Sequence, residues 1–111
     1  MPGSDADLGA VLTRLYQTIE SRANADPTTS YTASLLAAGP LQCAKKLGEE
    51  AVEAALAGAA GEKAALAAEA GDVLYHLLVL MVAAGVKPRD VAAILAGREG
   101  ASGFDEKASR T

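Results

Sequence analysis

The stretch GEEAVEAALAGAAGEKAALAAEAGD, residues 48–72, predicts two helices joined by a short turn. Alanine, the strongest helix former, dominates it, and GAAG at residues 58–61 supplies the glycines that a tight turn needs. Helical periodicity extends the two helices to about residues 41–56 and 62–84, with Gly85 as the C-terminal stop. The centre of the chain is therefore predicted to be an antiparallel helical hairpin.

Acidic residues recur in this otherwise apolar hairpin, and they are Glu49, Glu50, Glu53, Glu62, Glu69 and Asp72. Glu50 and Asp72 are equidistant from residue 61, so the hairpin should place them level with each other across the turn. The same holds for Glu53 and Glu69. Residues three apart share a helix face, and the two levels are separated by about 4.5 Å of helical rise. We therefore expect these four carboxylates to form a square.

Four carboxylates this close repel one another and lose hydration, and divalent cations relieve both effects. Hard oxygen ligands suit Mg²⁺, and Mn²⁺ is a second possibility. Mg²⁺ commonly shares its coordination shell with substrate phosphates. The sequence thus predicts a Mg²⁺-dependent site that acts on a phosphate ester or anhydride.

One other interpretation of the acids stays open, and a second, a di-iron site, is disfavoured by the sequence. Acids on a helix commonly form a solvated face, and the chain would then be a non-catalytic helical interaction module. A di-iron bundle needs Glu-x-x-His on two helices, whereas His76 is the single histidine here. His76 follows Asp72 by four residues and could support the metal ligands, although a core or interface histidine is an equally good interpretation.

The rest of the sequence predicts three more helices and no strand, so the fold class is all-α, an antiparallel bundle of about five helices. The first should begin after Ser4, a candidate N-cap, and end near residues 24–27. The others are expected at about residues 29–36 and 88–97. We expect residues 1–98 to form one domain and residues 99–111 a polar tail.

Composition limits the possible functions. The formal net charge of -4 argues against nucleic-acid binding, which calls for clustered Lys and Arg. The lone Cys43 and an acidic start without an apolar segment favour a cytoplasmic protein. The apolar run at residues 64–86 is interrupted by Glu69, Asp72 and His76, so we expect no membrane span. Alanine-rich helices bury little area each, which favours an oligomer.

Three segments carry a resemblance to a known family. Glu50-x-x-Glu53 followed by Glu69-x-x-Asp72 resembles the metal-binding pattern of the all-α MazG-like nucleotide pyrophosphohydrolases. More narrowly, LYQTIESRANADPTTSYTASLL, KKLGEEAVE and DVLYHLLVLM resemble the phosphoribosyl-ATP pyrophosphohydrolase family of histidine biosynthesis. The resemblance covers about residues 15–95, which is most of the chain.

The resemblance implies a cytoplasmic hydrolase that binds ATP-like nucleotides and forms a homodimer. It would convert 1-(5-phosphoribosyl)-ATP and water into 1-(5-phosphoribosyl)-AMP and pyrophosphate, the second step of histidine biosynthesis, with Mg²⁺ as cofactor. A house-cleaning nucleoside triphosphate pyrophosphatase is the alternative, since it needs the same acids. By position, Glu50, Glu53, Glu69 and Asp72 match the metal ligands. Glu49 or Glu53 would accept the proton of the attacking water, and the candidate substrate contacts are Lys46, Lys45, Ser30 and Tyr31.

Overall fold

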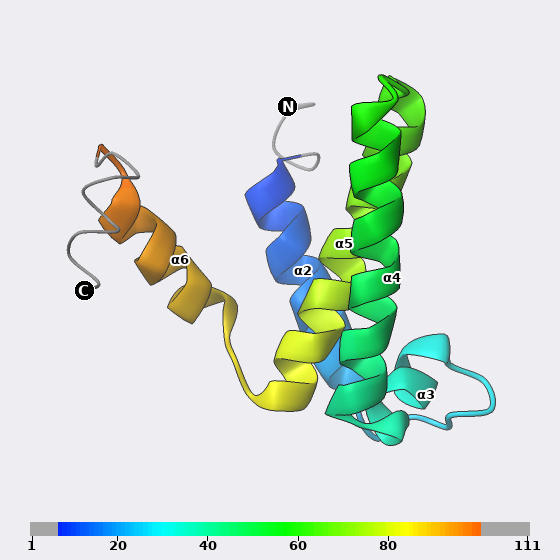
Figure 1. Cartoon of the computed structure of the whole chain (residues 1–111). Helices are drawn as coiled ribbons and strands as arrows, with labels where there is room; N and C mark the ends of the chain where they lie inside the picture. The colour runs from blue at the N-terminus through cyan, green and yellow to red at the C-terminus, as the bar shows by residue number, and fades with distance from the viewer. Residues whose placement is uncertain (1–6, 101–111) are drawn as a thin grey trace.

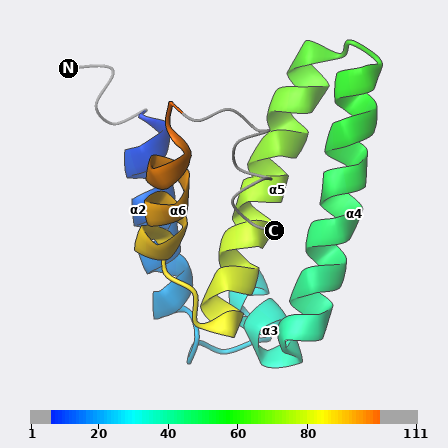
Figure 2. The same cartoon turned by 60° about the vertical axis from the view of Figure 1, so that its left-hand side comes forward.

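The computed structural model describes residues 7–100, and over that range its five helices confirm the all-α fold. The helices are α2 (Leu8–Ser21), α3 (Tyr31–Ala38), α4 (Pro40–Ala59), α5 (Lys63–Ala84) and α6 (Pro88–Arg98). Helices α4 and α5 run side by side as a long antiparallel hairpin (Figures 1 and 2). Helix α2 packs along α5, and α3 closes the open end of the hairpin. The predicted boundary between the domain and the tail stays a prediction, because residues 101–111 lie outside the described part.

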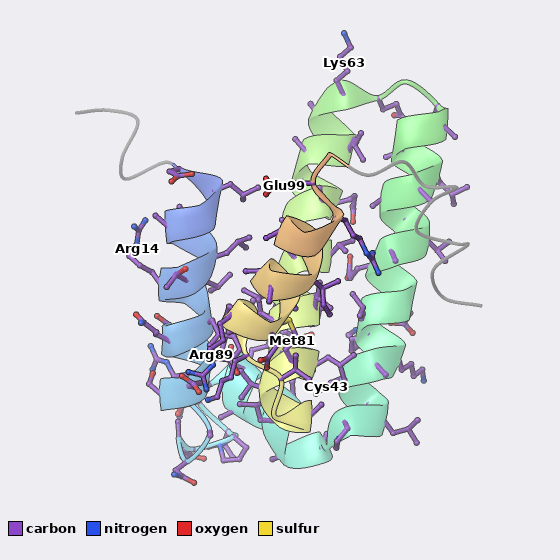
Figure 3. All side chains as sticks on the ribbon, turned by 90° about the vertical axis from the view of Figure 1, so that its left-hand side faces the viewer. Arg14, Cys43, Lys63, Met81, Arg89 and Glu99 are labelled. Atoms are coloured by element: carbon purple, nitrogen blue, oxygen red, sulfur yellow. The ribbon has the colours of Figure 1, made fainter. Side chains whose placement is uncertain are left out.

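The hairpin turn lies where the glycines predicted it. Gly61 has a φ of +74°, a left-handed conformation that L side chains rarely adopt, and it lets the chain reverse in a few residues. At the neighbouring Gly58 the two helices are in contact, since a Cβ atom there would lie 3.6 Å from the side chain of Leu66, an ordinary van der Waals distance. In Figure 3, Lys63 marks this end of the hairpin and Cys43 lies toward the other end.

The first described helix begins later and ends earlier than the sequence suggested. Ser4, the expected N-cap, lies outside the described residues, and within them Asp7 is the N-cap of α2. The Asp7 carboxylate accepts a hydrogen bond from the Gly9 N–H at 3.3 Å, which satisfies one of the free donors of the first turn. The helix ends at Ser21, and the Asp26 side chain then accepts bonds from both the N–H and the hydroxyl of Thr28. Pro27 is the middle residue of this Asx turn, which lies beyond the end of the helix.

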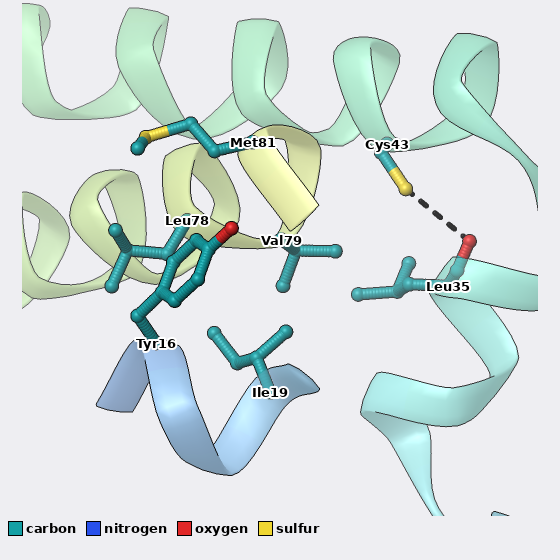
Figure 4. Packing of buried hydrophobic residues seen from close by; sticks show 7 residues of the cluster. All are labelled: Tyr16, Ile19, Leu35, Cys43, Leu78, Val79 and Met81. Carbon is teal, nitrogen blue, oxygen red and sulfur yellow. Dashed lines mark hydrogen bonds between the residues drawn. The ribbon is translucent and has the colours of Figure 1, made fainter. Parts of the chain in front are cut away.

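The core is small and lies where α2, α3 and α4 meet the second half of α5 (Figure 4). Its buried members are Tyr16, Ile19, Leu35, Cys43, Leu78, Val79 and Met81. The Cys43 thiol is fully buried and donates to the Leu35 carbonyl at 3.2 Å, linking α4 to α3 (Figure 4). Burial raises the pKa of this thiol, which keeps it protonated and able to donate. The single cysteine is thus part of the packing.

The connection from α5 to α6 is tied to α2. Gly85 ends α5 in the left-handed conformation, with a φ of +78°. The Tyr16 hydroxyl donates to the Val86 carbonyl at 2.9 Å, and the Lys87 ammonium pairs with Glu20 at 2.8 Å. Beyond Pro88, α6 stands apart from the hairpin in Figures 1 and 2, and it has no fully buried residue. The residues just before α6 are therefore fixed to the bundle, while most of the surface of α6 is exposed.

Large apolar side chains remain exposed on α4 and α5. They are Leu41, Val52, Leu56, Leu66 and Leu77, with exposed fractions of 86%, 59%, 65%, 39% and 37%. By length and composition α5 could cross a membrane, and only 22% of its most apolar window is buried inside the chain. A core helix of a water-soluble protein passes the same test, and Glu69 and Asp72 lie on this helix. The expectation of no membrane span therefore stays a prediction.

Candidate metal centre

Three of the predicted ligands come together in the middle of the hairpin. Glu50 on α4 and Glu69 and Asp72 on α5 each offer a carboxylate oxygen, and these oxygens all lie within 4.8 Å of one another. We call these three residues the acid group. Glu50 and Glu69 are half-buried and Asp72 is exposed, so the group opens to solvent on one side. The level pairing of Glu50 with Asp72 about residue 61 is what the sequence predicted.

A buried oxygen of Glu69 shows that the acid group fits a cation. Among the described residues, Glu69 Oε2 has no hydrogen-bond partner although it is shielded from solvent. Leaving a charged oxygen unpaired is costly, and nearby anions increase that cost. A hard divalent cation would coordinate this oxygen and neutralise the three charges, and carboxylates are its preferred ligands. The acid group can therefore hold a divalent metal ion.

Glu53, the fourth predicted ligand, lies outside this group of three. The neighbouring carboxyl group of Glu50 is the main cause that raises the pKa of Glu53. The charges of Glu49 and Asp72 raise it further. Glu53 is thus a neighbour of the acid group through Glu50. The register argument paired it with Glu69, whereas the oxygens grouped with Glu69 belong to Glu50 and Asp72.

The two lysines lie on α4 about one turn before Glu50, and Glu49 directly precedes Glu50. Lys46 pairs with Glu49 at 3.5 Å, and the side chain of Glu49 is half exposed. Lys45 is exposed. Both lysines are on α4 at the side of the acid group that faces α3, but the structure brings neither of them into the group. Their predicted role in phosphate binding stays a prediction.

An aromatic group lies where α3 meets α5. It consists of Tyr31, Tyr75 and His76, with ring centroids 6.5 Å (Tyr31–Tyr75), 6.3 Å (Tyr31–His76) and 5.0 Å (Tyr75–His76) apart. The Tyr75 hydroxyl is fixed by a 2.6 Å hydrogen bond with the Thr32 hydroxyl. His76 is 5% exposed, and its Nδ1 has no hydrogen-bond partner in the described part of the chain. His76 thus packs between rings, and a supporting role toward the metal stays a prediction.

Sequence reasoning named Tyr31, Ser30 and His76 but not Tyr75. Ser30 proves to be the N-cap of α3, because its hydroxyl oxygen accepts from the Ala33 N–H at 3.1 Å. The signal for Tyr75 was its position three residues after Asp72, which places both on one face of α5. Its partner on α3 could not be found from spacing alone.

A cavity of about 500 Å³ lies elsewhere, between α2 and the beginning of α6. Tyr16, Lys87 and Arg89 are among its lining residues, and no acid lines it. Because it lacks any carboxylate, this cavity offers no ligands for a hard divalent cation, and the acid group is the candidate metal site.

Comparison with known proteins agrees with this geometry. Residues 12–99 match the family described as phosphoribosyl-ATP pyrophosphohydrolase. The phosphoribosyl-ATP pyrophosphatase of Cereibacter sphaeroides is 56% identical over 100 residues, which span 90% of this chain and 97% of the relative. The protein of the same name from Dinoroseobacter shibae is 55% identical over 101 residues, 91% of this chain and 99% of the relative. The one from Azospirillum brasilense is 52% identical over 101 residues, 91% of each chain.

The match to the family covers α3 to α6 and all but the first turn of α2, and it includes every residue of the acid group. Hairpin, acids and relatives agree, and the chain belongs to the phosphoribosyl-ATP pyrophosphohydrolase family.

Proposed function

We propose that this chain hydrolyses 1-(5-phosphoribosyl)-ATP to 1-(5-phosphoribosyl)-AMP and pyrophosphate with Mg²⁺ held by the acid group. The reaction is the histidine-biosynthesis step that gives the family its name. The observation that carries the proposal is the convergence of Glu50, Glu69 and Asp72 within 4.8 Å, with a buried oxygen of Glu69 left unpaired. Mg²⁺ suits three carboxylates that open to solvent on one side, because it keeps several waters and binds substrate phosphates. Mn²⁺ would fit the same ligands.

In this reaction, water attacks phosphorus, the bond between the α- and β-phosphates breaks, and pyrophosphate leaves. A bound divalent ion supplies charge neutralisation of the triphosphate. Glu49 and Glu53 are the candidate proton acceptors, since both flank Glu50 on α4 and the nearby Glu50 raises the pKa of Glu53. As the fourth predicted ligand, Glu53 would need to turn from Glu50 toward the ion.

Substrate contacts follow from the residues around the acid group. Lys46 and, more weakly, Lys45 would meet phosphate oxygens, and Lys46 would exchange its partner Glu49 for them. Ser30 uses its oxygen to cap α3, so its hydroxyl hydrogen can still be donated to a phosphate or ribose oxygen. Tyr31 lies beside it with 56% of its surface exposed. His76 would support this side of the site from the interior.

A homodimer would cover the apolar surface of the hairpin. Five large apolar side chains of α4 and α5 are exposed in the single chain, and most of the apolar window of α5 is not buried. A second copy that packs its hairpin against this surface would bury it and complete the bundle. We expect a cytoplasmic enzyme with a small nucleotide as substrate and with neither nucleic acid nor membrane as a partner.

The first test is pyrophosphate release from 1-(5-phosphoribosyl)-ATP, with ATP and dCTP as control substrates and with Mg²⁺, Mn²⁺ or chelator. Metal-dependent release from 1-(5-phosphoribosyl)-ATP alone supports the proposal. Release mainly from ATP and dCTP would move the chain to the house-cleaning enzymes and keep the metal site. Absence of release from all three would favour the interaction module and refute the proposal.

Analytical ultracentrifugation tests the dimer independently of activity. The full chain is expected to sediment at twice its mass, and Leu56→Glu to shift it toward the monomer. Glu62→Lys, at the exposed hairpin turn, changes a charge without touching the apolar surface and serves as the control. A wild-type chain that remains monomeric at high concentration would refute the dimer.

A further inference from the structure

We infer that Tyr31 is the surface on which the adenine ring of the substrate stacks, and that it favours adenine substituted at N1. The inference rests on the proposed function and deepens it by naming what selects the substrate. The first observation is the position of Tyr31 in the fold. Tyr31 is the first residue of α3 and has 56% of its surface exposed, although it belongs to a packed group of three rings.

The rings of Tyr75 and His76 support the ring of Tyr31 on its inner side. Its ring is nearly parallel to that of Tyr75, with an angle of 20° between the planes, and it meets His76 edge to face at 89°. Tyr75 is itself held by Thr32 through a 2.6 Å hydrogen bond, and His76 is buried. A ring supported in this way loses little freedom when a second flat ring stacks on its open side.

The aromatic group also lies at the right distance from the phosphate site. Tyr75 and His76 follow Asp72 by three and four residues on α5, which is about 4.5–6 Å of rise along the same face. Tyr31 lies one ring further, at 6.3 Å from His76. A nucleoside triphosphate whose terminal phosphates lie at the acid group can therefore extend its base to Tyr31.

The chemistry of the substrate explains why a tyrosine suits this position. Attachment of a ribosyl carbon to N1 of adenine gives the ring system a positive charge at neutral pH, which ATP lacks. The face of a tyrosine ring attracts a cation through its quadrupole. Stacking on Tyr31 would thus hold 1-(5-phosphoribosyl)-ATP more strongly than ATP, without any group that recognises the added sugar.

The experiment compares wild type, Tyr31→Ala and Tyr31→Phe for hydrolysis of 1-(5-phosphoribosyl)-ATP and ATP, with inorganic triphosphate as a base-free inhibitor. Tyr31→Ala should raise KM for 1-(5-phosphoribosyl)-ATP by about 5- to 150-fold, the range for loss of one base stack. Tyr31→Ala should also lower the preference for 1-(5-phosphoribosyl)-ATP over ATP, and it should leave inhibition by inorganic triphosphate unchanged. Tyr31→Phe keeps the ring and should stay within about threefold of wild type.

The outcomes separate the inference from the proposed function. A wild-type chain that does not hydrolyse 1-(5-phosphoribosyl)-ATP refutes the proposed function, and the inference falls with it. An active wild type with unchanged KM in Tyr31→Ala refutes the stacking alone. Equal losses in Tyr31→Phe and Tyr31→Ala would assign the effect to the hydroxyl and overturn the inference. Weaker inhibition by triphosphate in Tyr31→Ala, or a changed sedimentation coefficient, would show a general structural defect and also overturn it.

Discussion

Glu69→Gln removes one charge from the acid group, and its effects on stability and activity should have opposite signs. At 4.8 Å, the upper limit of the distances in the group, two unit charges repel by about 1 kcal/mol in bulk water and by about 3.5 kcal/mol at an effective dielectric constant of about 20. Because Asp72 is exposed, solvent screens the group and the lower part of this range applies. The metal-free variant should therefore gain about 1–2 kcal/mol in free energy of unfolding.

Thermal unfolding of wild type and Glu69→Gln at one protein concentration measures this gain in stability, since about 1 kcal/mol corresponds to roughly 4–8 °C in Tm for a small domain. Mg²⁺ should raise the Tm of the wild type, by the equivalent of about 2.7 kcal/mol at a concentration 100 times its Kd. Glu69→Gln should lose most of that rise, because the buried Oε2 position no longer carries charge. Its turnover of 1-(5-phosphoribosyl)-ATP should fall by more than about 100-fold, beyond the loss typical of groups that merely support a metal ligand.

Glu62→Gln is the matched control. Glu62 precedes α5 at the exposed turn, makes no capping hydrogen bond with its side chain and lies outside the acid group. It should keep the wild-type response to Mg²⁺ and the wild-type turnover. If Glu69→Gln behaved like Glu62→Gln in both assays, the assignment of the acid group as the metal site would be refuted.

Three further predictions concern the helical bundle that carries the site. Tyr16→Phe should lower the free energy of unfolding by about 0.5–1.5 kcal/mol, because the Val86 carbonyl loses the hydroxyl that donates to it at 2.9 Å. Urea titrations should show this as a lower midpoint at an unchanged m-value. An unchanged midpoint would show that this bond contributes nothing. Gly85→Ala should cost about 1–2 kcal/mol, since its φ of +78° is strained for alanine although the added Cβ meets nothing within 4 Å. Gly48→Ala, where φ is helical and the space is also open, should instead stabilise by about 0.5–1 kcal/mol, and a loss there would contradict the helix-propensity argument.

The hairpin and its register could be predicted because both depend on local rules. Glycines at residues 58 and 61 mark the turn, and equal distances from residue 61 place Glu50 level with Asp72. Register gives height along the helices but not the direction of each side chain around them. For this reason the reasoning that placed Glu50 level with Asp72 did not foresee that Glu53 would lie outside the group formed by Glu50, Glu69 and Asp72.

Features that depend on contacts between distant segments could not be predicted. The Tyr75 hydroxyl forms a hydrogen bond with the Thr32 hydroxyl, 43 positions away in the sequence, and no local spacing predicts that pair. The helical pattern of α6 was recognised, but nothing in it indicated that the helix would stand apart from the hairpin. The start of α2 differed because an aspartate at residue 7 caps as well as a serine does, and sequence alone cannot rank them.

The location of the acid group within one hairpin has a consequence for the order of folding. All three carboxylates lie in residues 50–72, which close on themselves through the turn at Gly61. Contacts between such neighbours form early, because little loop entropy opposes them. A divalent cation that binds this hairpin would then already be bound in the transition state. It should speed refolding and leave the unfolding rate nearly unchanged, which is the kinetic behaviour of a ligand whose site belongs to the nucleus.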